Sequence, residues 1–350
     1  MTWDEIAPAL DMPALHHTRW SIKASTRSTA ERRRMVANLP VLACFTSGTS
    51  AAPQRWSRSG EQLLAEVDVT LAVLPPDIDA VYTCVPPDSL YGSIAMLLGV
   101  VRGLPVVHDR WALGSLPITG RRPLVVTIPI AWRWLPPTLS RCAGNAVIVH
   151  AGASMPASAA AALAGTATDD AFELFGASEC GLIATRPAQT GPSQAPWTVL
   201  PDVQLVHGPD SHEQRIRIRS PRIARGPDGL LREVCTLGDW VRVLDERRFE
   251  FQGRRDRLVK VRGKAVDLDQ FEHLLHGVFP HIDMVCVPVV DDGWGEHFEV
   301  YVAADQNTAD SVHATLREMR GRLPAAPRRV VAVHRIDRSS MGKTRVLQTR

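Results

Sequence analysis

The chain has 350 residues, of which 45% are hydrophobic and 22% are charged, and its formal net charge at pH 7 is +3. A chain of this length can bury a large core in two or three domains, and so small a net charge does not favour nucleic acid as a partner. The sequence has no apolar run of about 18 residues, and its acidic start lacks the basic and then apolar stretches of a signal peptide. We therefore expect a cytoplasmic protein that neither crosses a membrane nor binds nucleic acid.

The first half of the chain alternates short apolar runs with a helical pattern. Residues 81–85, 124–128 and 146–149 are apolar runs with the length of buried strands. Between the first two, apolar residues recur over 90–101 at the spacing of one helix face. A strand, a helix and a strand in succession predict a parallel sheet covered by helices.

The pattern changes after about residue 200. Residues 215–219 alternate arginine with isoleucine, as a half-exposed strand does, and we expect a separate β-rich subdomain here. From residue 253 onward two predicted strands and two predicted helices indicate a small α+β domain. The strands are 258–261 and 284–290, and the helices are 271–278 and 311–323. The predicted division is a core of residues 1–252 and a second domain of residues 253–350.

The six cysteines are widely spaced and form no Cys-x-x-Cys pair. We expect reduced, buried side chains rather than a disulfide framework or a zinc site. They are Cys44, Cys84, Cys142, Cys180, Cys235 and Cys286.

The first chemical motif follows the apolar run of residues 41–45. It consists of Thr46, Ser47, Gly48, Thr49 and Ser50, in which hydroxyl side chains surround one glycine. Such a loop can wrap phosphate oxygens with backbone N–H and side-chain O–H groups, but an ordinary Ser/Thr-rich turn has the same composition. From the segment alone both interpretations stay open. Ser59 and Gln62 then form the pattern of a capping box at the start of a helix.

The second motif is Glu173-Leu174-Phe175-Gly176-Ala177-Ser178-Glu179-Cys180-Gly181. It places an aromatic ring, a glycine, a hydroxyl and a carboxylate near a strand end, where α/β sheets bind ligands. Phe175 can stack on a base, Ser178 can bond a phosphate, and Glu179 can hold Mg²⁺. The Gly-x-Ser-x-x-Gly spacing disfavours the nucleophile elbow of serine hydrolases, which needs Gly-x-Ser-x-Gly.

The third motif contains a Gly-Asp pair at 238–239, a Gly-Arg-Arg-Asp-Arg-Leu-Val-Lys run at 253–260, and Lys343 near the end of the chain. Lys343 is one of four lysines beside 36 arginines, which hints at a specific use of its compact ammonium group. Taken alone, the residue is more often a solvated lysine near the end of the chain, and only the motifs before it favour the specific use. It is not part of a Walker phosphate loop, because Asp337 occupies the position that the first glycine would need.

In this order and spacing the three motifs resemble the adenylate-forming superfamily, which includes acyl-CoA synthetases, nonribosomal-peptide adenylation domains and luciferases. The resemblance extends from about residue 41 to the end of the chain. Residues 178–186 and 218–221 look closest to the short bacterial acyl or aryl acid ligases of aryl-polyene and related pigment pathways. The resemblance implies an α/β core with a β-rich part and a small mobile C-terminal domain that hinges near Asp256.

The resemblance also implies a two-step ligase. A carboxylate attacks the α-phosphate of ATP to give an acyl-AMP, and a thiol of coenzyme A or of a carrier protein's phosphopantetheine arm then displaces AMP. In that scheme Thr46 to Ser50 hold the β- and γ-phosphates, Ser178 contacts the α-phosphate, and Glu179 binds Mg²⁺. Adenine lies between Phe175, next to Gly176, and Gly152-Ala153, while Asp239 and Arg254 hold the ribose. Lys343 stabilises the charge of adenylation, and Lys260 to Gly263 face the pantetheine tunnel after the domain rotates.

This sequence departs from the family pattern in three places. The phosphate loop has Ala51 where glycine is usual and Gln54 where lysine is usual, and Arg55 replaces that charge only in part. Ser89 stands where a histidine commonly gates the acyl pocket. The loop also begins at residue 46, so we expect much of one sheet layer to be absent or supplied by a homodimer contact or a partner chain.

The acyl pocket of such a ligase would be mostly apolar in this chain, which suits an aryl or medium-length acyl acid such as a hydroxylated benzoate or cinnamate. Its expected lining is Tyr91, Ile94, Ala95, Leu98, His150 and Ala177. The arginines of the last 23 residues suit either the phosphates of coenzyme A or an acidic carrier protein as acceptor. The resemblance to the pigment-pathway ligases slightly favours the carrier protein. The alternative is a degenerate, non-catalytic member that binds a nucleotide or a carrier or partner protein, motivated by Gln54 and the late phosphate loop.

Overall fold

The computed structural model describes the chain in a series of segments. These are residues 10, 19–45, 54–109, 120–133, 135, 139, 145–152, 155, 159, 163, 170–188, 195–206, 213–254, 257–261, 264–291, 295–319 and 323–337. Within them, no helix is long and apolar enough to cross a membrane.

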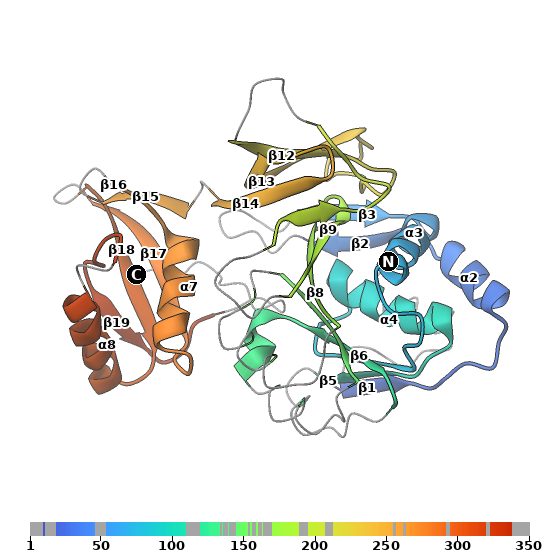
Figure 1. Ribbon diagram of the computed structural model, residues 1–350, viewed down its shortest axis with the longest axis horizontal. Helices are drawn as coiled ribbons and strands as arrows, with labels where there is room; N and C mark the ends of the chain where they lie inside the picture. The colour runs from blue at the N-terminus through green and yellow to red at the C-terminus, as the bar shows by residue number, and fades with distance from the viewer. Residues whose placement is uncertain are drawn as a thin grey trace.

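A 12-stranded sheet runs through the larger part of the protein in the order β1-β5-β4-β6-β7-β8-β9-β10-β14-β13-β12-β11 (Figure 1). Its first half contains five parallel strands with β1 antiparallel at the edge. The strands of this half are β1 (Arg19–Ile22), β4 (Ala80–Thr83), β5 (Val106–Asp109), β6 (Pro123–Thr127), β7 (Val147–Ala151) and β8 (Ala171–Ala177). The predicted parallel sheet is therefore confirmed.

The second half of the sheet is antiparallel. Its strands are β9 (Gly181–Pro187), β10 (Trp197–Val199), β11 (Gln204–Leu205), β12 (Glu213–Arg219), β13 (Val234–Val243) and β14 (Arg248–Arg254). The predicted β-rich region exists and has its own hydrophobic cluster, but it is not a separate sheet. Strand β9 pairs with β8 on one side and β10 on the other, which joins the two halves through backbone hydrogen bonds.

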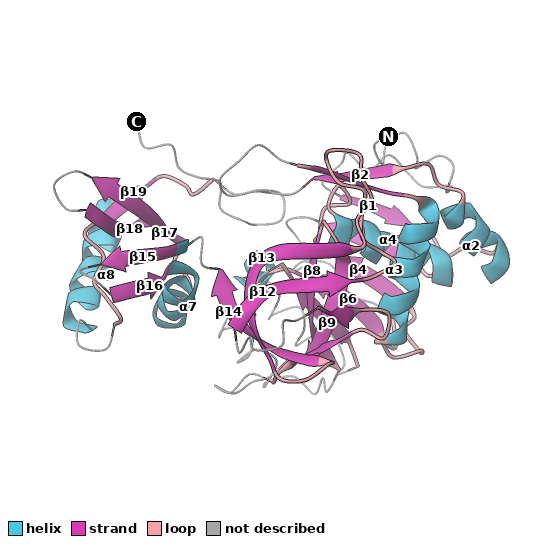
Figure 2. Ribbon diagram, turned by 90° about the horizontal axis from the view of Figure 1, so that it is seen from above, coloured by secondary structure: helices cyan, strands magenta, loops and turns pink. Residues whose placement is uncertain are grey.

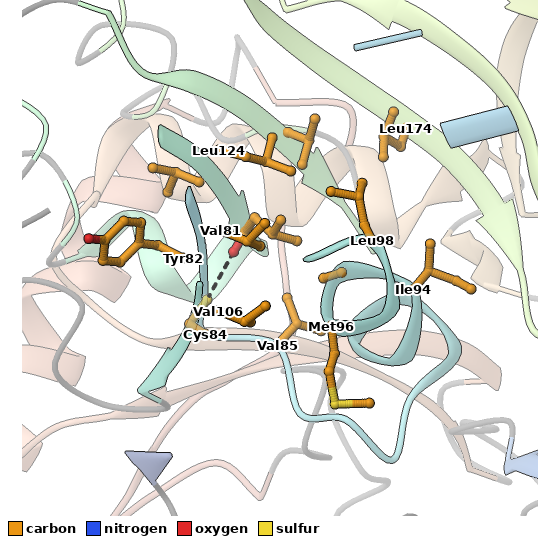
Figure 3. Packing of buried hydrophobic residues seen from close by; sticks show 14 of the residues in the cluster. Val81, Tyr82, Cys84, Val85, Ile94, Met96, Leu98, Val106, Leu124 and Leu174 are labelled. Atoms are coloured by element: carbon orange, nitrogen blue, oxygen red, sulfur yellow. Dashed lines mark hydrogen bonds between the residues drawn. The ribbon is translucent and has the colours of Figure 1, made fainter. Parts of the chain in front are cut away.

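Three helices pack beside the parallel half: α2 (Thr29–Ala37), α3 (Gly60–Ala72) and α4 (Leu90–Arg102) (Figure 2). A 3-10 helix, η2, spans Pro129–Arg133. The predicted capping box of α3 is present, with Ser59 Oγ accepting from the Gln62 N–H and the Gln62 side chain accepting from the Ser59 N–H. Helix α4 is apolar almost all round and packs against β4 and β5, and its Ile94, Met96 and Leu98 lie in the core (Figure 3).

A small hairpin, β2 (Leu42–Phe45) and β3 (Arg55–Arg58), flanks the predicted phosphate loop. The two strands are antiparallel, and their last pair is Phe45 with Arg55. The segment between these two residues therefore starts and ends at the same end of the hairpin. The loop residues Thr46 to Ser50 themselves lie outside the described residues.

The C-terminal part has its own core, formed by a hairpin, a three-stranded sheet and two helices. The hairpin is β15 (Leu258–Val261) with β16 (Lys264–Asp267), and the sheet is β17 (Met284–Asp291), β18 (Gly295–Ala303) and β19 (Val330–Val333). The helices are α7 (Leu268–Val278) and α8 (Gln306–Glu318). Helix α8 begins five residues before the predicted 311–323, because Asp305 caps it by accepting from the Thr308 N–H. The α+β class is confirmed, whereas the boundary at residue 253 stays a prediction.

Candidate functional site

The second sequence motif occupies strand β8 and the tight turn that follows it. Phe175 and Gly176 lie just before the end of β8, and Ser178 and Glu179 form the turn before β9, both half-buried. The Cys180 N–H closes the turn on the Ala177 carbonyl at 3.2 Å. The predicted phosphate contact and the predicted Mg²⁺ ligand therefore lie next to each other at a strand end.

Gly152 lies at the same edge of the sheet. Strands β7 and β8 are parallel, with Ala151 opposite Leu174, so Gly152 and Phe175 follow at the carboxyl ends of neighbouring strands. Gly152 is exposed and has a φ of 99°, a conformation that favours glycine, and among the described residues the nearest atom to the position of a Cβ is Ile128 Cγ2 at 3.8 Å. The open backbone here fits a flat group placed beside Phe175. Ala153 lies outside the described residues.

Phe175 is part of an aromatic cluster rather than a free-standing ring. Its ring centroid lies 5.5 Å from that of Trp197, 5.6 Å from Phe249 and 6.0 Å from Phe251. Trp197 in turn packs under the Arg186 guanidinium, which lies 4.3 Å from the ring centroid. The cluster fixes the orientation of Phe175 through the neighbouring strands β10 and β14.

Asp239 is buried in β13 directly opposite Arg254 of β14. A β-bulge between Asp239 and Val241 shifts the register at this point, a feature that re-aims side chains in a strand. Asp239 and Arg254, the two residues predicted to contact the ribose, are thus opposite each other in paired strands. The Arg254 side chain is not among the described ones. Phe251 lies on β14 with Arg254 and pairs with Val241 of β13. The strand pair that carries Asp239 therefore also carries a member of the aromatic cluster around Phe175.

The hairpin that flanks the predicted phosphate loop is bound to the Ser178 turn. Arg58, the last residue of β3, donates from Nη1 to the Ser178 carbonyl at 2.7 Å. Ser57 and Arg225 exchange two backbone hydrogen bonds of 3.0 and 2.9 Å, and the Ala224 N–H donates to the Glu179 carbonyl at 2.8 Å. The structure therefore brings together the flank of the first motif and the centre of the second.

A buried charge network lies beneath this turn. We use that name for Arg58, Glu66, Arg222 and Asp202. Arg222 is fully buried and lies 2.8 Å from Glu66 and 2.6 Å from Asp202. Burial raises the pKa of the Glu66 carboxyl, and the positive charges of Arg222 and Arg58 oppose that rise.

The sequence motifs do not reveal this network. Its members come from β3, α3 and two loops, so no local spacing connects them. One signal is present at Glu66, which follows Leu63 by three residues and precedes Val67 and Thr70 on the buried face of α3. A carboxylate on an apolar helix face requires a buried partner.

The expected acyl-pocket residues are packed in the main core. Ile94, Ala95 and Leu98 are buried, and the buried His150 Nδ1 accepts from Trp132 Nε1 at 3.0 Å. The Tyr91 hydroxyl donates to the Val149 carbonyl at 3.2 Å. Ser89, which replaces the expected histidine, caps α4 by accepting from the Gly92 N–H. These contacts assign structural roles to the residues and leave the acid unidentified.

Of the other predicted site residues, one has a described backbone only, and the rest lie outside the described residues. Lys260 lies in β15 opposite Ala265, with its side chain outside the described ones. Gly263, Asp256 and Lys343 lie outside the described residues. The five described cysteines are free and buried, as expected.

A search against protein-family models finds no match. The chain is 26% identical over 227 residues to a 4-coumarate–CoA ligase of Cereibacter sphaeroides, a match that covers 63% of this chain. The match covers 50% of that protein, so it spans about half of the relative's length.

Solved structures show the same fold. An amide bond synthetase, McbA from Marinactinospora thermotolerans, superposes with a TM-score of 0.63 and 21% identity over 86% of this chain and 67% of the other. O-succinylbenzoate coenzyme A synthetase from Bacillus subtilis, in complex with AMP, gives a TM-score of 0.67 and 15% identity over the same shares. In fold, and more distantly in sequence, this protein resembles the AMP-forming ligases, which confirms the resemblance predicted from the motifs.

Proposed function

We propose that this protein is an AMP-forming acid–thiol ligase, which activates an aryl or acyl carboxylic acid with ATP and Mg²⁺ and transfers it to a phosphopantetheine thiol. The observation that carries the proposal is the convergence of the Ser178–Glu179 turn, Gly152 and the β2–β3 hairpin at one edge of the sheet. The similarity to a 4-coumarate–CoA ligase supports the reaction class.

The residues at this edge fit a magnesium–nucleotide complex. Magnesium in such sites uses one or two carboxylates, and phosphate oxygens and waters supply its other ligands. Glu179 is one half-buried carboxylate on a tight turn, and the described residues contain no group of three or more candidate metal ligands. This donor set suits a metal that arrives with the phosphates of ATP, whose charge the ion would partly neutralise.

In the proposed reaction the acid's carboxylate oxygen attacks the α-phosphorus and the bond to pyrophosphate breaks. Ser178 would donate a hydrogen bond to the α-phosphate, and Asp239 would accept from the ribose hydroxyls. Lys343 would place its ammonium group between the acid and the phosphate, where negative charge develops. The thiol sulfur then attacks the acyl carbonyl carbon, AMP leaves, and the thiol proton is lost to solvent.

The acceptor is proposed to be a carrier protein, with coenzyme A as the alternative. The last described strand of the C-terminal part is followed by an exposed pair of Arg335 and Asp337, and several further arginines precede the end of the chain. Mass spectrometry of the thioester formed with each acceptor distinguishes the two.

Pyrophosphate exchange into ATP tests the proposal across a panel of aryl and fatty acids. We expect exchange with at least one aryl or medium-length acid, and a loss of exchange in Lys343→Ala. No exchange with any acid, or undiminished exchange in the variant, would overturn the assignment. Calorimetry with ATP and Mg²⁺ identifies the second candidate, because tight nucleotide binding without exchange is the behaviour of a non-catalytic binding protein.

The substitution Lys343→Arg tests the role of the ammonium group more closely. The predicted phosphate loop has Gln54 in place of its own lysine, which leaves Lys343 as the ammonium group expected at the ATP phosphates. A planar guanidinium does not replace a compact point charge on a flexible stem. We expect Lys343→Arg to abolish pyrophosphate exchange and to spare thioester formation from a preformed acyl-AMP. Equal loss of both steps would place Lys343 elsewhere in the mechanism.

A further inference from the structure

Arg58 is an unusual residue for the end of a two-stranded hairpin. Its side chain is 1% exposed, and one of its three nitrogens, Nη1, donates to the Ser178 carbonyl. The other two, Nε and Nη2, are buried and make no hydrogen bond to the described residues. A guanidinium buried with unused donors is costly, so its presence indicates a constraint other than stability.

The rest of the buried charge network holds the opposite end of the same turn. Glu66 Oε2 accepts from the Leu182 N–H at 3.1 Å, and Arg222 Nη2 donates to the Leu182 carbonyl at 2.7 Å. Both backbone groups of Leu182 are therefore bound to charged side chains that are themselves fully buried. With Arg58 on Ser178, the network contacts the backbone at both ends of residues 178–182.

Gly181 shows how closely the network approaches the turn. It has a φ of 76°, and a Cβ atom there would lie 1.5 Å from Glu66 Oε1. The turn can adopt its shape only because the backbone is bare at this point, so the position of Ser178 and Glu179 is coupled to the position of Glu66.

We propose that Arg58 is a positioning residue that couples the phosphate-loop hairpin to the turn carrying Ser178 and Glu179, with Glu66 and Arg222 as the fixed base of that turn. The inference rests on the proposed function for the role of Ser178 and Glu179 in binding the nucleotide. The rigidity of the turn is inferred from the contacts alone. Arg58 acts through the Ser178 carbonyl and is not assigned a contact with substrate.

The first experiment measures rigidity without any ligand. Amide hydrogen exchange over residues 178–182 is compared in the full-length protein and in Arg58→Met, which keeps the length of the side chain and removes its charge and donors. Loss of one hydrogen bond from a charged group should speed exchange of this turn by about tenfold or more. The matched control is Arg33→Met. Arg33 is a half-exposed arginine of α2 that donates two hydrogen bonds to Asp68, and Asp68 lies on α3, the helix that carries Glu66. The control variant should leave the turn unchanged.

The second experiment measures ATP binding by calorimetry with Mg²⁺ and with a chelator. Residues that orient a metal ligand typically change metal affinity or activity by about 10–100-fold when removed. We expect Arg58→Met to lose that factor from the magnesium-dependent part of ATP affinity, while affinity in the chelator changes little. Arg58→Lys keeps the charge without the fork geometry and should recover part of the loss.

The outcomes separate this inference from the proposed function. If the unmodified protein binds no ATP and exchanges no pyrophosphate, the proposed function fails, and hydrogen exchange still decides whether Arg58 positions the turn. Unchanged exchange over 178–182 in a folded Arg58 variant overturns the positioning role, as does an equal loss of ATP affinity with and without Mg²⁺. If neither variant folds, Arg58 serves overall stability and the inference is wrong.

Discussion

Replacing Arg186 with methionine should destabilise the larger part of the protein by about 3–5 kcal/mol, because it leaves a buried carboxylate without its partner. Arg186 Nε and Nη2 bond the two oxygens of Glu173 at 2.9 and 3.0 Å, and the two side chains are only 4% and 6% exposed. Glu173 begins the motif that contains Ser178 and Glu179. The other contact of Glu173 among the described residues, from the Met155 N–H at 3.3 Å, is too weak to compensate an ionised group.

Urea unfolding followed by tryptophan fluorescence measures this loss. Removing both charges, in Glu173→Leu with Arg186→Met, should restore much of the stability, because a buried ion pair can often be exchanged for apolar residues at little cost. Arg242→Met is the control, since Arg242 pairs with Glu250 on the exposed face of β13 and β14 and should contribute about 1 kcal/mol or less. A loss below about 1 kcal/mol in Arg186→Met, or a double variant as unstable as the two single losses combined, would refute the reasoning.

Four other positions give further predictions. Gly181→Ala should lower stability by at least about 1–3 kcal/mol, the usual cost of one strained backbone position, and a thermal melt showing no change would contradict the close approach of Glu66. Asp239→Asn should weaken ATP binding by about tenfold, the effect of one hydrogen bond to a charged group, and calorimetry with unchanged affinity would remove Asp239 from the nucleotide site. Burial raises the pKa of the Cys44 thiol to about 11 and that of Cys84 to about 12, so the reactive thiolate is scarce below those values. Neither should react with iodoacetamide at about pH 8 until the protein is unfolded, and mass spectrometry that finds either one labelled in the folded state would contradict this.

The fold was predictable from the sequence wherever one physical signal dominated. Apolar runs such as 124–128 are buried on both faces in β6, and the arginine–isoleucine alternation of 215–219 matches the exposed and buried faces of β12. The predicted start of α8 was too late because residues 306–310 are mostly polar and carry no apolar periodicity, and the Asp305 cap is the only local signal that the helix begins there. That the β-rich region continues the main sheet depends on β10, which pairs with β9 on one side and with β14 on the other. The pairing with β14 brings Trp197 opposite Phe249, and contact between segments so far apart leaves no mark in the sequence.

The candidate site was predictable to the extent that its chemistry is local. Ser178 and Glu179 are adjacent, and Asp239 follows a glycine, so the sequence predicts a nucleotide site through the resemblance of these motifs to the adenylate-forming superfamily. Arg58 and Arg222 cannot be found in this way, because each is one of 36 arginines and only the fold shows which ones are buried. Their roles depend on contacts across more than a hundred residues of sequence.

The distribution of positive charge links these observations. Three buried arginines, Arg58, Arg186 and Arg222, each hold a backbone carbonyl or a carboxylate, and the latter two bind a carboxylate through two nitrogens. Fork geometry of this kind is what a guanidinium offers and an ammonium does not, which explains arginine at these three positions. Of the four lysines, Lys343 is the one for which the resemblance implies a mobile point charge at the phosphates. A rigid arginine framework that positions the turn and a flexible lysine that supplies charge during the reaction would be complementary parts of one adenylation site.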